Sequence, residues 1–253
     1  MTETLALTPV GVGFAYGRPG EAQSCYLVGG GGTTVCLDLG SGALNRLQGH
    51  VAPEHLAAIV ISHLHSDHCV DLVSLRVYMM IGPGRGRRVR VIGPPGLREL
   101  MAAFAGRDGW DASFTFEVLD PAAPCDLGGG VVMTCAPVPH RGPTFAIRLD
   151  RGGASVTYGA DCRPNDALPA LASGCGVLLA ECSEGVGPAP EGSAHLTAAD
   201  AGLMARRAGA GRLLLTHCAP EHDRDAALAA AREAFGGDVD WARQGEAVVV
   251  SAG

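Results

Sequence analysis

The feature that constrains this chain most is a short apolar run that ends in a cluster of imidazole and carboxylate side chains. Residues 59–61 are Ile-Val-Ile, typical of a buried β-strand, and residues 62–68 read Ser-His-Leu-His-Ser-Asp-His. Imidazole and carboxylate are the usual protein ligands of zinc and similar divalent ions. A packed core has no use for four such groups side by side, because each would need its own buried partner. The stretch therefore predicts a metal site.

The spacing within this cluster indicates how its side chains are aimed. His63 and His65 are two residues apart, so they leave an extended segment on the same face. Asp67 and His68 follow where the chain is expected to turn into the next helix. The pattern H-x-H-x-D-H therefore predicts two pairs of ligands aimed at one point from the end of a strand.

Composition places this cluster in a compact globular protein. The chain has 253 residues, of which 47% are hydrophobic and 18% charged, enough for a substantial core. The net charge of −7, with no basic tail, argues against nucleic acid as a broad, charge-driven partner. The first residues lack the basic and apolar regions of a secretory signal, and no apolar run reaches the ~20 residues that a membrane span needs. We therefore expect no membrane partner.

The cysteines indicate a reducing compartment. There are nine, an odd number, and no two form a C-x-x-C pair, which predicts free thiols rather than a disulfide framework. We therefore expect a cytoplasmic protein. Cys69 and Cys218 each follow a candidate ligand histidine, and we expect both to be small buried side chains rather than soft metal ligands.

Strand patterns and helix patterns interleave along the whole chain. The second half contains a helix pattern at 197–208, which Thr197 can cap with Asp200 at the third helical position. No linker and no solenoid period divides the chain, so we expect a single domain over residues 1–253 with two similar halves of mixed sheets covered by helices. The main predicted elements are hairpins at 25–37 and 144–158, helices at 71–80 and 223–235, a loop at 121–130, and strands at 89–92, 131–137, 177–180 and 213–215.

Three isolated polar groups come where later strands are expected to end. His140 follows residues 131–139, Asp161 follows 156–160 and His217 follows 212–216. Chemically active residues tend to lie on loops that a rigid scaffold holds. Together with the first cluster this makes five histidines and two carboxylates, too many for one tetrahedral ion. The set suits two ions about 3.5–4 Å apart that share a carboxylate and a water.

In this order the motifs, from 62–68 to Leu-Thr-His at 215–217, resemble those of the metallo-β-lactamase-fold superfamily and span most of the chain. The resemblance implies an α/β (α+β) fold, a four-layer αββα sandwich of two pseudo-repeated halves, with a dinuclear site at one edge between the sheets. It also implies two divalent ions. Zinc suits these ligands, and mixtures of histidine and aspartate accept manganese or iron as well.

The same resemblance implies how the ligands divide. His63, His65 and His140 would bind one ion, Asp67, His68 and His217 would bind the second, and Asp161 would bridge the two. Asp67 would also contribute to catalysis. His50, His55 and His222 lie outside the pattern, and we expect them at the surface.

A further pair resembles the branch that contains ribonuclease Z and cyclic-nucleotide phosphodiesterases. Glu181-Cys-Ser is followed by His195-Leu-Thr, as in a relay where a glutamate and a histidine come after the bridging aspartate. An alcohol is a poor leaving group, so we expect His195 to donate a proton to it and Glu181 to hold the ring and raise its pKa. The alternative stays open that Glu181 is only a strand-end carboxylate and His195 only a helix-start residue.

The departures from the ribonuclease Z pattern guide the choice of substrate. Residues 140–161 leave room for a short hairpin only, not for a tRNA-gripping arm, and the chain is acidic. We therefore predict a dinuclear metal-dependent hydrolase, a phosphodiesterase that uses a metal-bridging hydroxide on a small phosphodiester such as cAMP. The alternatives are a ribonuclease Z-like tRNA 3′-endonuclease without the arm, and a lactonase- or thioesterase-type hydrolase. Nucleic acid is not favoured as a partner, and a homodimer is open because relatives often dimerise.

Overall fold

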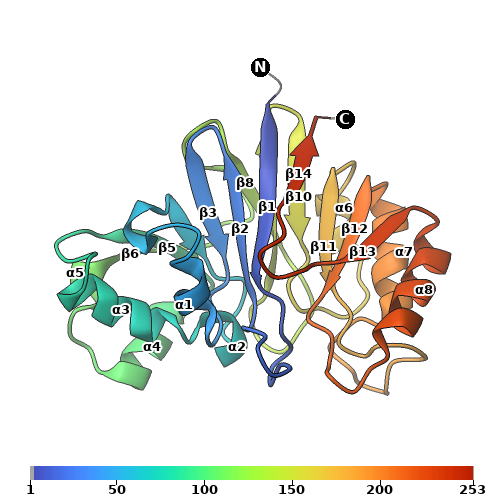
Figure 1. Cartoon of the computed structure of the whole chain (residues 1–253), viewed down its shortest axis with the longest axis horizontal. Helices are drawn as coiled ribbons and strands as arrows, with labels where there is room; N and C mark the ends of the chain where they lie inside the picture. The colour runs from blue at the N-terminus through green and yellow to red at the C-terminus, as the bar shows by residue number, and fades with distance from the viewer. Residues whose placement is uncertain (1–2, 253) are drawn as a thin grey trace.

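The computed structural model describes residues 3–252 as two facing β-sheets with helices on both outer surfaces (Figure 1). The four-layer αββα arrangement predicted from the sequence is confirmed. Each sheet has seven strands, and the chain builds the first sheet almost completely before it starts the second. Only the last strand returns to the first sheet, where it pairs with the first strand.

The first sheet has the strand order β14-β1-β2-β3-β4-β5-β6. Strands β3 to β6 run parallel, and β14, β1, β2 and β3 pair antiparallel, so the sheet is mixed. Its strands are β1 (Thr4–Gly11), β2 (Cys25–Gly30), β3 (Thr33–Leu37), β4 (Ala58–Val60), β5 (Val89–Gly93), β6 (Phe114–Val118) and β14 (Val248–Ser251).

The second sheet has the order β13-β12-β11-β10-β9-β8-β7. Here β10 to β13 are parallel, while β7, β8, β9 and β10 pair antiparallel. Its strands are β7 (Cys125–Asp126), β8 (Val132–Pro137), β9 (Phe145–Arg151), β10 (Ala154–Tyr158), β11 (Val177–Glu181), β12 (Arg212–Thr216) and β13 (Asp238–Trp241).

The helices divide between the two outer faces. Those of the first half cover the first sheet, and those of the second half cover the second. Thr197 caps α7 by the predicted capping box, in which its side chain and that of Asp200 each accept a backbone N–H. The helices are α1 (Ala43–Leu47), α2 (Ser66–Cys69), α3 (Leu72–Ile81), α4 (Leu97–Ala105), α5 (Trp110–Ser113), α6 (Ala167–Leu171), α7 (Ala198–Ala208) and α8 (Arg224–Phe235), besides a 3₁₀ turn at Pro53–His55.

Three apolar layers hold these elements together. Residues of both sheets, such as Leu5 and Val156, fill the space between the sheets. Leu72 of α3 packs in the layer under the first set of helices, and Ala201 of α7 packs in the layer under the second. Because strands such as β4, β11 and β12 contribute side chains to two of these layers, burying apolar area fixes their register.

The predicted hairpins at 25–37 and 144–158 are confirmed, whereas short elements escaped prediction. Strand β7 lies inside the stretch 121–130 that was predicted to be a loop, so that prediction was wrong in part. Two residues are too few to show an alternating pattern, and β7 exists because β8 offers it a partner. Helix α5 and strand β13 have four residues each and were not predicted, because so few residues show no periodic pattern.

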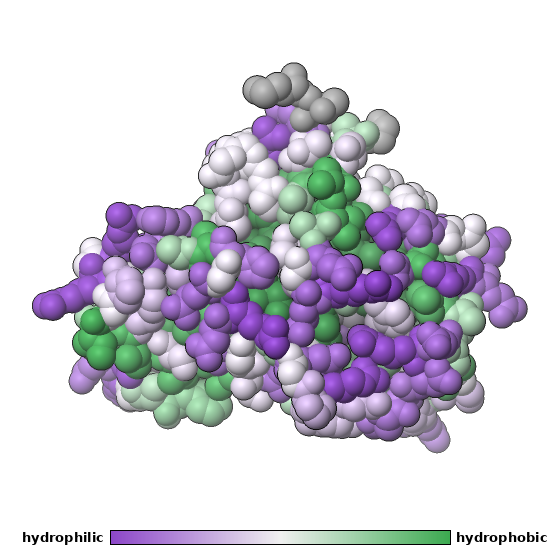
Figure 2. Space-filling model, viewed as in Figure 1, coloured by the Kyte–Doolittle hydropathy of each residue, from purple (hydrophilic) through white to green (hydrophobic). Residues whose placement is uncertain are grey.

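The helices and the exposed side chains differ in how apolar they are. Among residues 3–252, no helix is both long enough and apolar enough to cross a bilayer. The face in Figure 2 is mostly hydrophilic or neutral, with hydrophobic side chains at the end where α3, α4 and α5 lie and again near the chain termini. Val77, Met80, Ile81 and Phe104 are the large exposed apolar side chains of α3 and α4.

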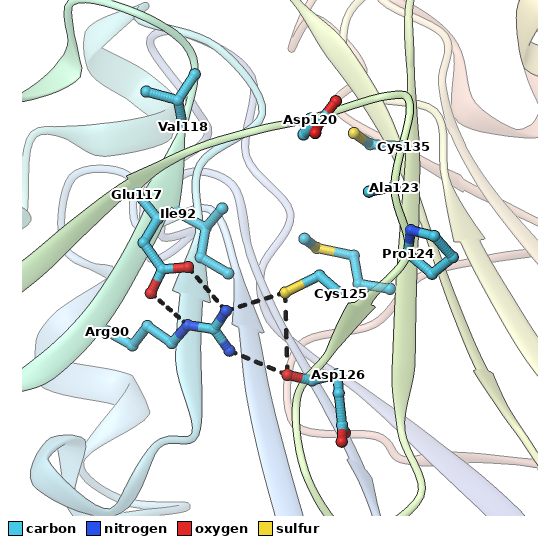
Figure 3. Close-up of a pocket in the computed structure, with 11 residues that line it drawn as sticks. Arg90, Ile92, Glu117, Val118, Asp120, Ala123, Pro124, Cys125, Asp126 and Cys135 are labelled. Atoms are coloured by element: carbon cyan, nitrogen blue, oxygen red, sulfur yellow. Dashed lines mark hydrogen bonds and ion pairs between the residues drawn. The ribbon is translucent and has the colours of Figure 1, made fainter.

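Arg90 on β5 makes contacts with β6 and β7, the edge strands of the two sheets (Figure 3). Its guanidinium makes two bonds to the Glu117 carboxylate on the neighbouring strand β6, at 2.6 and 2.8 Å. The same group donates to the Cys125 sulfur at 3.0 Å and to the Asp126 carbonyl at 3.1 Å, both on β7 of the other sheet. The four residues line a cavity of about 330 Å³. One arginine therefore bridges both sheets where the sandwich opens.

We expect Arg90→Gln to lower the free energy of unfolding by about 1 kcal/mol, the upper range for a partly exposed ion pair. The hydrogen bond from Arg90 lowers the pKa of Glu117. A carboxyl group whose folded pKa is lowered stabilises above its ordinary pKa and loses this effect as pH falls through the lowered value. The difference between the two proteins should thus be full at pH 7 and shrink in acid to what the contacts of Arg90 with Cys125 and the Asp126 carbonyl contribute. Urea unfolding across pH measures it, and Arg98→Gln, at a more exposed pair, is the control. A difference of the same size in acid and at pH 7 would contradict the role of the ion pair.

Candidate metal centre

The first half supplies its polar side chains from the end of one strand. His63 and His65 follow β4, and Asp67 and His68 lie in the short helix α2. Helix α2 begins directly after His65, which brings Asp67 and His68 back toward the strand end. All but His65 are buried.

The second half supplies its residues from strand ends at the same edge of the molecule. His140 follows β8, Asp161 follows β10 and His217 follows β12. Glu181 is the last residue of β11, and His195 comes just before the capped start of α7. Because β10, β11 and β12 are parallel neighbours, their carboxyl ends lie side by side.

These residues gather into groups with the geometry of ion sites. In each group the possible ligand atoms lie within 4.8 Å of one another. Asp161 belongs to all three groups, and the first two groups each take two residues from each half of the chain. The groups are His63, His65, His140 and Asp161; Asp67, His68, Asp161 and His217; and Asp161, Glu181 and His195. The structure thus brings together all nine residues that the sequence singled out.

The hydrogen bonds of four of the five candidate histidines engage Nδ1 and leave Nε2 to face an ion. Ser62 Oγ donates to Asp38, so it accepts from His63 Nδ1 at 3.0 Å and leaves Nε2 without a proton. Ser183 Oγ donates to the His217 carbonyl and accepts from His217 Nδ1 in the same way. His68 Nδ1 donates to Asp38 Oδ2 at 2.7 Å, and His140 Nδ1 donates to the Ala194 carbonyl at 3.1 Å. Four Nε2 atoms are therefore available as ligands.

The contacts among these atoms fit a cation better than they fit hydrogen bonding. His65 Nδ1 lies 3.1 Å from His63 Nε2 and 3.2 Å from His140 Nε2, so three ring nitrogens converge. His68 Nε2 and Asp161 Oδ1 are buried without a hydrogen-bond partner in the described part of the chain. Unpaired buried polar atoms are costly, and an ion between them removes this cost. The donors, imidazole and carboxylate, suit zinc.

Comparison with known proteins identifies the family. A sequence model described as "Beta-lactamase superfamily domain" matches residues 36–218. The chain belongs to this superfamily. The matched segment runs from β3 to just beyond β12 and contains all nine site residues.

Several relatives of this superfamily member are similar over most of their length. The probable metallo-hydrolase YhfI of Bacillus subtilis is 27% identical, over 95% of this chain and 98% of YhfI. The crystal structure of YhfI superposes with a TM-score of 0.88 at 26% identity, covering 98% of this chain and 99% of YhfI. Ribonuclease Z of Mycolicibacterium paratuberculosis is 31% identical, over 85% of this chain and 86% of the enzyme. These similarities support a metal-dependent hydrolase.

Electrostatics in this β-lactamase superfamily site keep His63 and His140 neutral and Asp161 ionised, whereas they favour a protonated His68 ring, whose Nε2 proton an ion would displace. Burial lowers the pKa of His63 well below its usual range and that of His140 to about 4, so both rings are neutral at pH 7. Burial acts in the same direction on His68, but the carboxylates of Asp161 and Asp38 outweigh it and raise its pKa. Burial alone would raise the pKa of Asp161, yet the surrounding histidines hold it well below its usual range. Asp161 therefore stays ionised.

Glu181 and His195 form a pair at the side of these groups. His195 Nδ1 lies 3.0 Å from Glu181 Oε1 and 3.8 Å from Asp161 Oδ2. Burial acts against the protonated ring, but the hydrogen bond to Glu181 outweighs it and raises the pKa of His195 to about 9. Glu181 is buried, which raises its pKa, and its second oxygen accepts from the Ser183 backbone N–H. The ring is thus held by a fixed carboxylate.

Asp38 is a site residue that the sequence reasoning missed. It follows β3, is fully buried and accepts four hydrogen bonds of 2.7–2.8 Å, from the Ser62 backbone and hydroxyl, His68 Nδ1 and the Tyr158 hydroxyl. It thus orients His68 directly and His63 through Ser62. Its signal in the sequence is a carboxylate directly after an apolar strand, which a turn explains equally well.

Three residues of this edge have left-handed backbone. Asp38, Ala160 and His217 have φ of 58°, 52° and 49°, and they are the only non-glycine residues with positive φ in 3–252. Such conformations cost of order 1–3 kcal/mol each and persist where the surroundings impose them. All three lie at strand ends that present the candidate ligands, so strain is concentrated where the side chains must be aimed.

Asp38→Asn should weaken binding of the ion that His68 would hold by about 10–100-fold, the usual effect of removing a group that orients a ligand. Asparagine keeps the volume but loses the charge that attracts His68 Nδ1–H. Titration of the metal-free protein with zinc, followed by calorimetry, measures the affinity. Tyr158→Phe removes one donor to Asp38 and a longer contact of 3.4 Å to His68 Nδ1, but leaves the Asp38 carboxylate as the acceptor of His68, so it should have a smaller effect. Equal affinity in wild type and Asp38→Asn would contradict the orienting role.

The remaining histidines and cysteines lie outside the groups. His50 and His55 are exposed and His222 is half-buried. Cys69 and Cys218 are buried, and neither belongs to an ion group of the described residues. The Cys69 sulfur contacts the His65 carbonyl. The Cys218 sulfur contacts the Ala219 carbonyl and interacts with Cys182. This agrees with buried thiols rather than soft ligands.

Proposed function

We propose that this protein is a dinuclear metal-dependent phosphodiesterase that acts on a small phosphodiester such as cAMP. The observation that carries the proposal is the Glu181–His195 pair directly beside Asp161. His195 Nδ1 is engaged by Glu181, while Nε2 has no hydrogen-bond partner within residues 3–252, and the ring lines the cavity over the ion groups. A histidine so held suits proton donation to an alcohol that leaves a phosphate.

The proposed roles follow from these positions. When bound, two divalent ions, for which we propose zinc, lower the pKa of a water toward neutrality and stabilise charge on phosphate oxygens. His63, His65 and His140 would hold one ion, Asp67, His68 and His217 the other, with Asp161 shared. His195 would protonate the leaving oxygen, and Glu181 would keep its ring oriented. Asp67 would act within the reactive face, since it lines the same cavity.

We further propose that the protein is cytoplasmic and that its chain forms a single domain. All nine cysteines are free thiols and eight of them are buried, which supports a reducing cytoplasm. Because the first two ion groups each draw on both halves of the chain, we propose that the two halves act as one domain.

The experiment is turnover by the metal-loaded protein with bis-p-nitrophenyl phosphate and cAMP, with metal content measured on the same sample. We expect hydrolysis of both, loss of activity on chelation and recovery on adding zinc. A p-nitrophenyl ester of a carboxylic acid and a lactone serve as substrates of the alternative hydrolase class. If only these were hydrolysed, the proposal would be wrong.

A second candidate is a tRNA 3′-endonuclease, favoured by the 31% identity to a protein named ribonuclease Z. Against it, β9 and β10 join through a tight Gly152–Gly153 turn, so no arm extends between His140 and Asp161. Precursor tRNA offered together with cAMP separates the two functions. Preferential cleavage of the tRNA would favour the endonuclease.

A further inference from the structure

Some residues that line the cavity over the ion groups have no role in the proposed reaction. It measures about 350 Å³ and includes Phe14, Ala15 and Arg141 along with the candidate ligands. Phe14 lies in the segment between β1 and β2, and Arg141 directly follows His140. Neither residue is a candidate ligand or part of the Glu181–His195 pair, so their function needs a separate account.

Arg141 is a cation without a protein partner. Its side chain is exposed at the cavity and makes no hydrogen bond or ion pair within residues 3–252, whereas most arginines of the chain are engaged by carboxylates or carbonyls. It follows His140, whose ring is fixed by the Ala194 carbonyl, so the backbone from which it extends is anchored. A free guanidinium beside a phosphate-handling site suits a phosphate oxygen.

The Phe14 ring lines the cavity and is held in place by two neighbouring rings. Its ring is half-buried and packs against the His217 ring, with centroids 5.1 Å apart. The Tyr16 ring meets it edge-on at 4.9 Å, and the Tyr16 hydroxyl donates to the Glu221 carboxylate at 2.8–2.9 Å. The loop that carries Phe14 is therefore tied to the loop after β12. A rigid aromatic ring at a cavity is a stacking surface for a planar group.

Resting on the proposed phosphodiesterase, we propose that Phe14 and Arg141 determine its specificity. Phe14 stacks on the nucleobase of a single nucleotide, and Arg141 binds a non-bridging oxygen of its phosphate. The two residues lie on the same cavity from separate segments, so a ligand that reaches both must carry a planar ring and an anionic group a short distance apart. A mononucleotide diester has these features, and a diester without a base has only one of them.

The test uses binding of product-like ligands to the metal-loaded protein by calorimetry, so it does not depend on turnover. Adenosine 5′-monophosphate carries base and phosphate, and ribose 5-phosphate carries phosphate only. We expect Phe14→Leu to weaken the nucleotide about tenfold and to leave ribose 5-phosphate unchanged. Arg141→Gln should weaken both ligands, each about tenfold. Phe104→Leu and Arg107→Gln, at exposed positions on and after α4, are matched controls and should bind both ligands as wild type does.

The outcomes are distinct from those that decide the reaction. If wild type binds the nucleotide no more tightly than ribose 5-phosphate, or if Phe14→Leu weakens both ligands equally, the stacking role is wrong. If Arg141→Gln leaves both affinities unchanged, the phosphate role is wrong. Failure of the proposed function looks different, because the metal-loaded wild type would then hydrolyse no phosphodiester whatever these affinities are. Thermal unfolding midpoints equal to that of wild type show that the variants are folded.

Discussion

Asp161→Asn should lower turnover of bis-p-nitrophenyl phosphate by about 10³-fold, equal to about 4 kcal/mol of transition-state stabilisation. Asp161 is the one residue common to all three ion groups, and it is buried with one oxygen unpaired. Asparagine keeps the shape but removes the negative charge that two adjacent cations would share. We therefore expect the metal content to fall from two ions per chain to one or fewer. Metal analysis of the same preparation used for kinetics provides the second measurement.

Asp166→Asn is the control for this substitution. Asp166 is five residues further along, and its side chain is 94% exposed beside Arg207, so loss of its charge should change neither metal content nor turnover. Full metal content with full activity in Asp161→Asn would rule out the bridging role. Full metal content with low activity would mean that Asp161 acts on the substrate rather than on the ions.

His195→Gln should lower turnover of cAMP by about 10²–10⁴-fold and that of bis-p-nitrophenyl phosphate much less. The ribose alkoxide needs a proton as it leaves, whereas p-nitrophenolate does not. Glutamine can still bond to Glu181 but cannot deliver a proton. Kinetics with the same enzyme preparation give the ratio of the loss with cAMP to the loss with bis-p-nitrophenyl phosphate.

The ratio separates a proton donor from a structural residue. Equal losses with both substrates would contradict proton donation and favour a packing role for His195. His55→Gln, an exposed position outside the site, should leave both rates unchanged. Glu181→Gln should lower the cAMP rate by less than His195→Gln does, since the ring and an acceptor for its Nδ1 remain but the negative charge of the partner is lost.

The fold and the candidate site residues were predicted from the sequence through two different signals. The cluster at 63–68 is local, and its residue types are chemically specific, so it needs no tertiary information. His140, Asp161 and His217 are single residues that gain meaning only from their places at strand ends and from their order. The structure brings all of them to one edge because parallel strands align their carboxyl ends there.

The residues and elements that escaped prediction are those whose role depends on which neighbours the fold places beside them. Asp38, Ser62 and Ser183 fix the rings of the ligands, yet each resembles an ordinary polar residue in a turn until its neighbour is known. Phe14 and Arg141 likewise become conspicuous only when distant segments close the cavity. Strand β7 forms because β8 lies beside it, not because two residues favour extended structure.

The equal division of the ion groups between the halves bears on the order in which the protein is assembled. A chain that has folded only one half offers just two ligands to either ion, which is too few to hold it tightly. Tight loading would therefore have to wait until the sheets have docked, and an ion bound afterwards would oppose their separation. Metal uptake would thus report completed folding, and loss of the ions would first shorten the lifetime of the contact between the sheets.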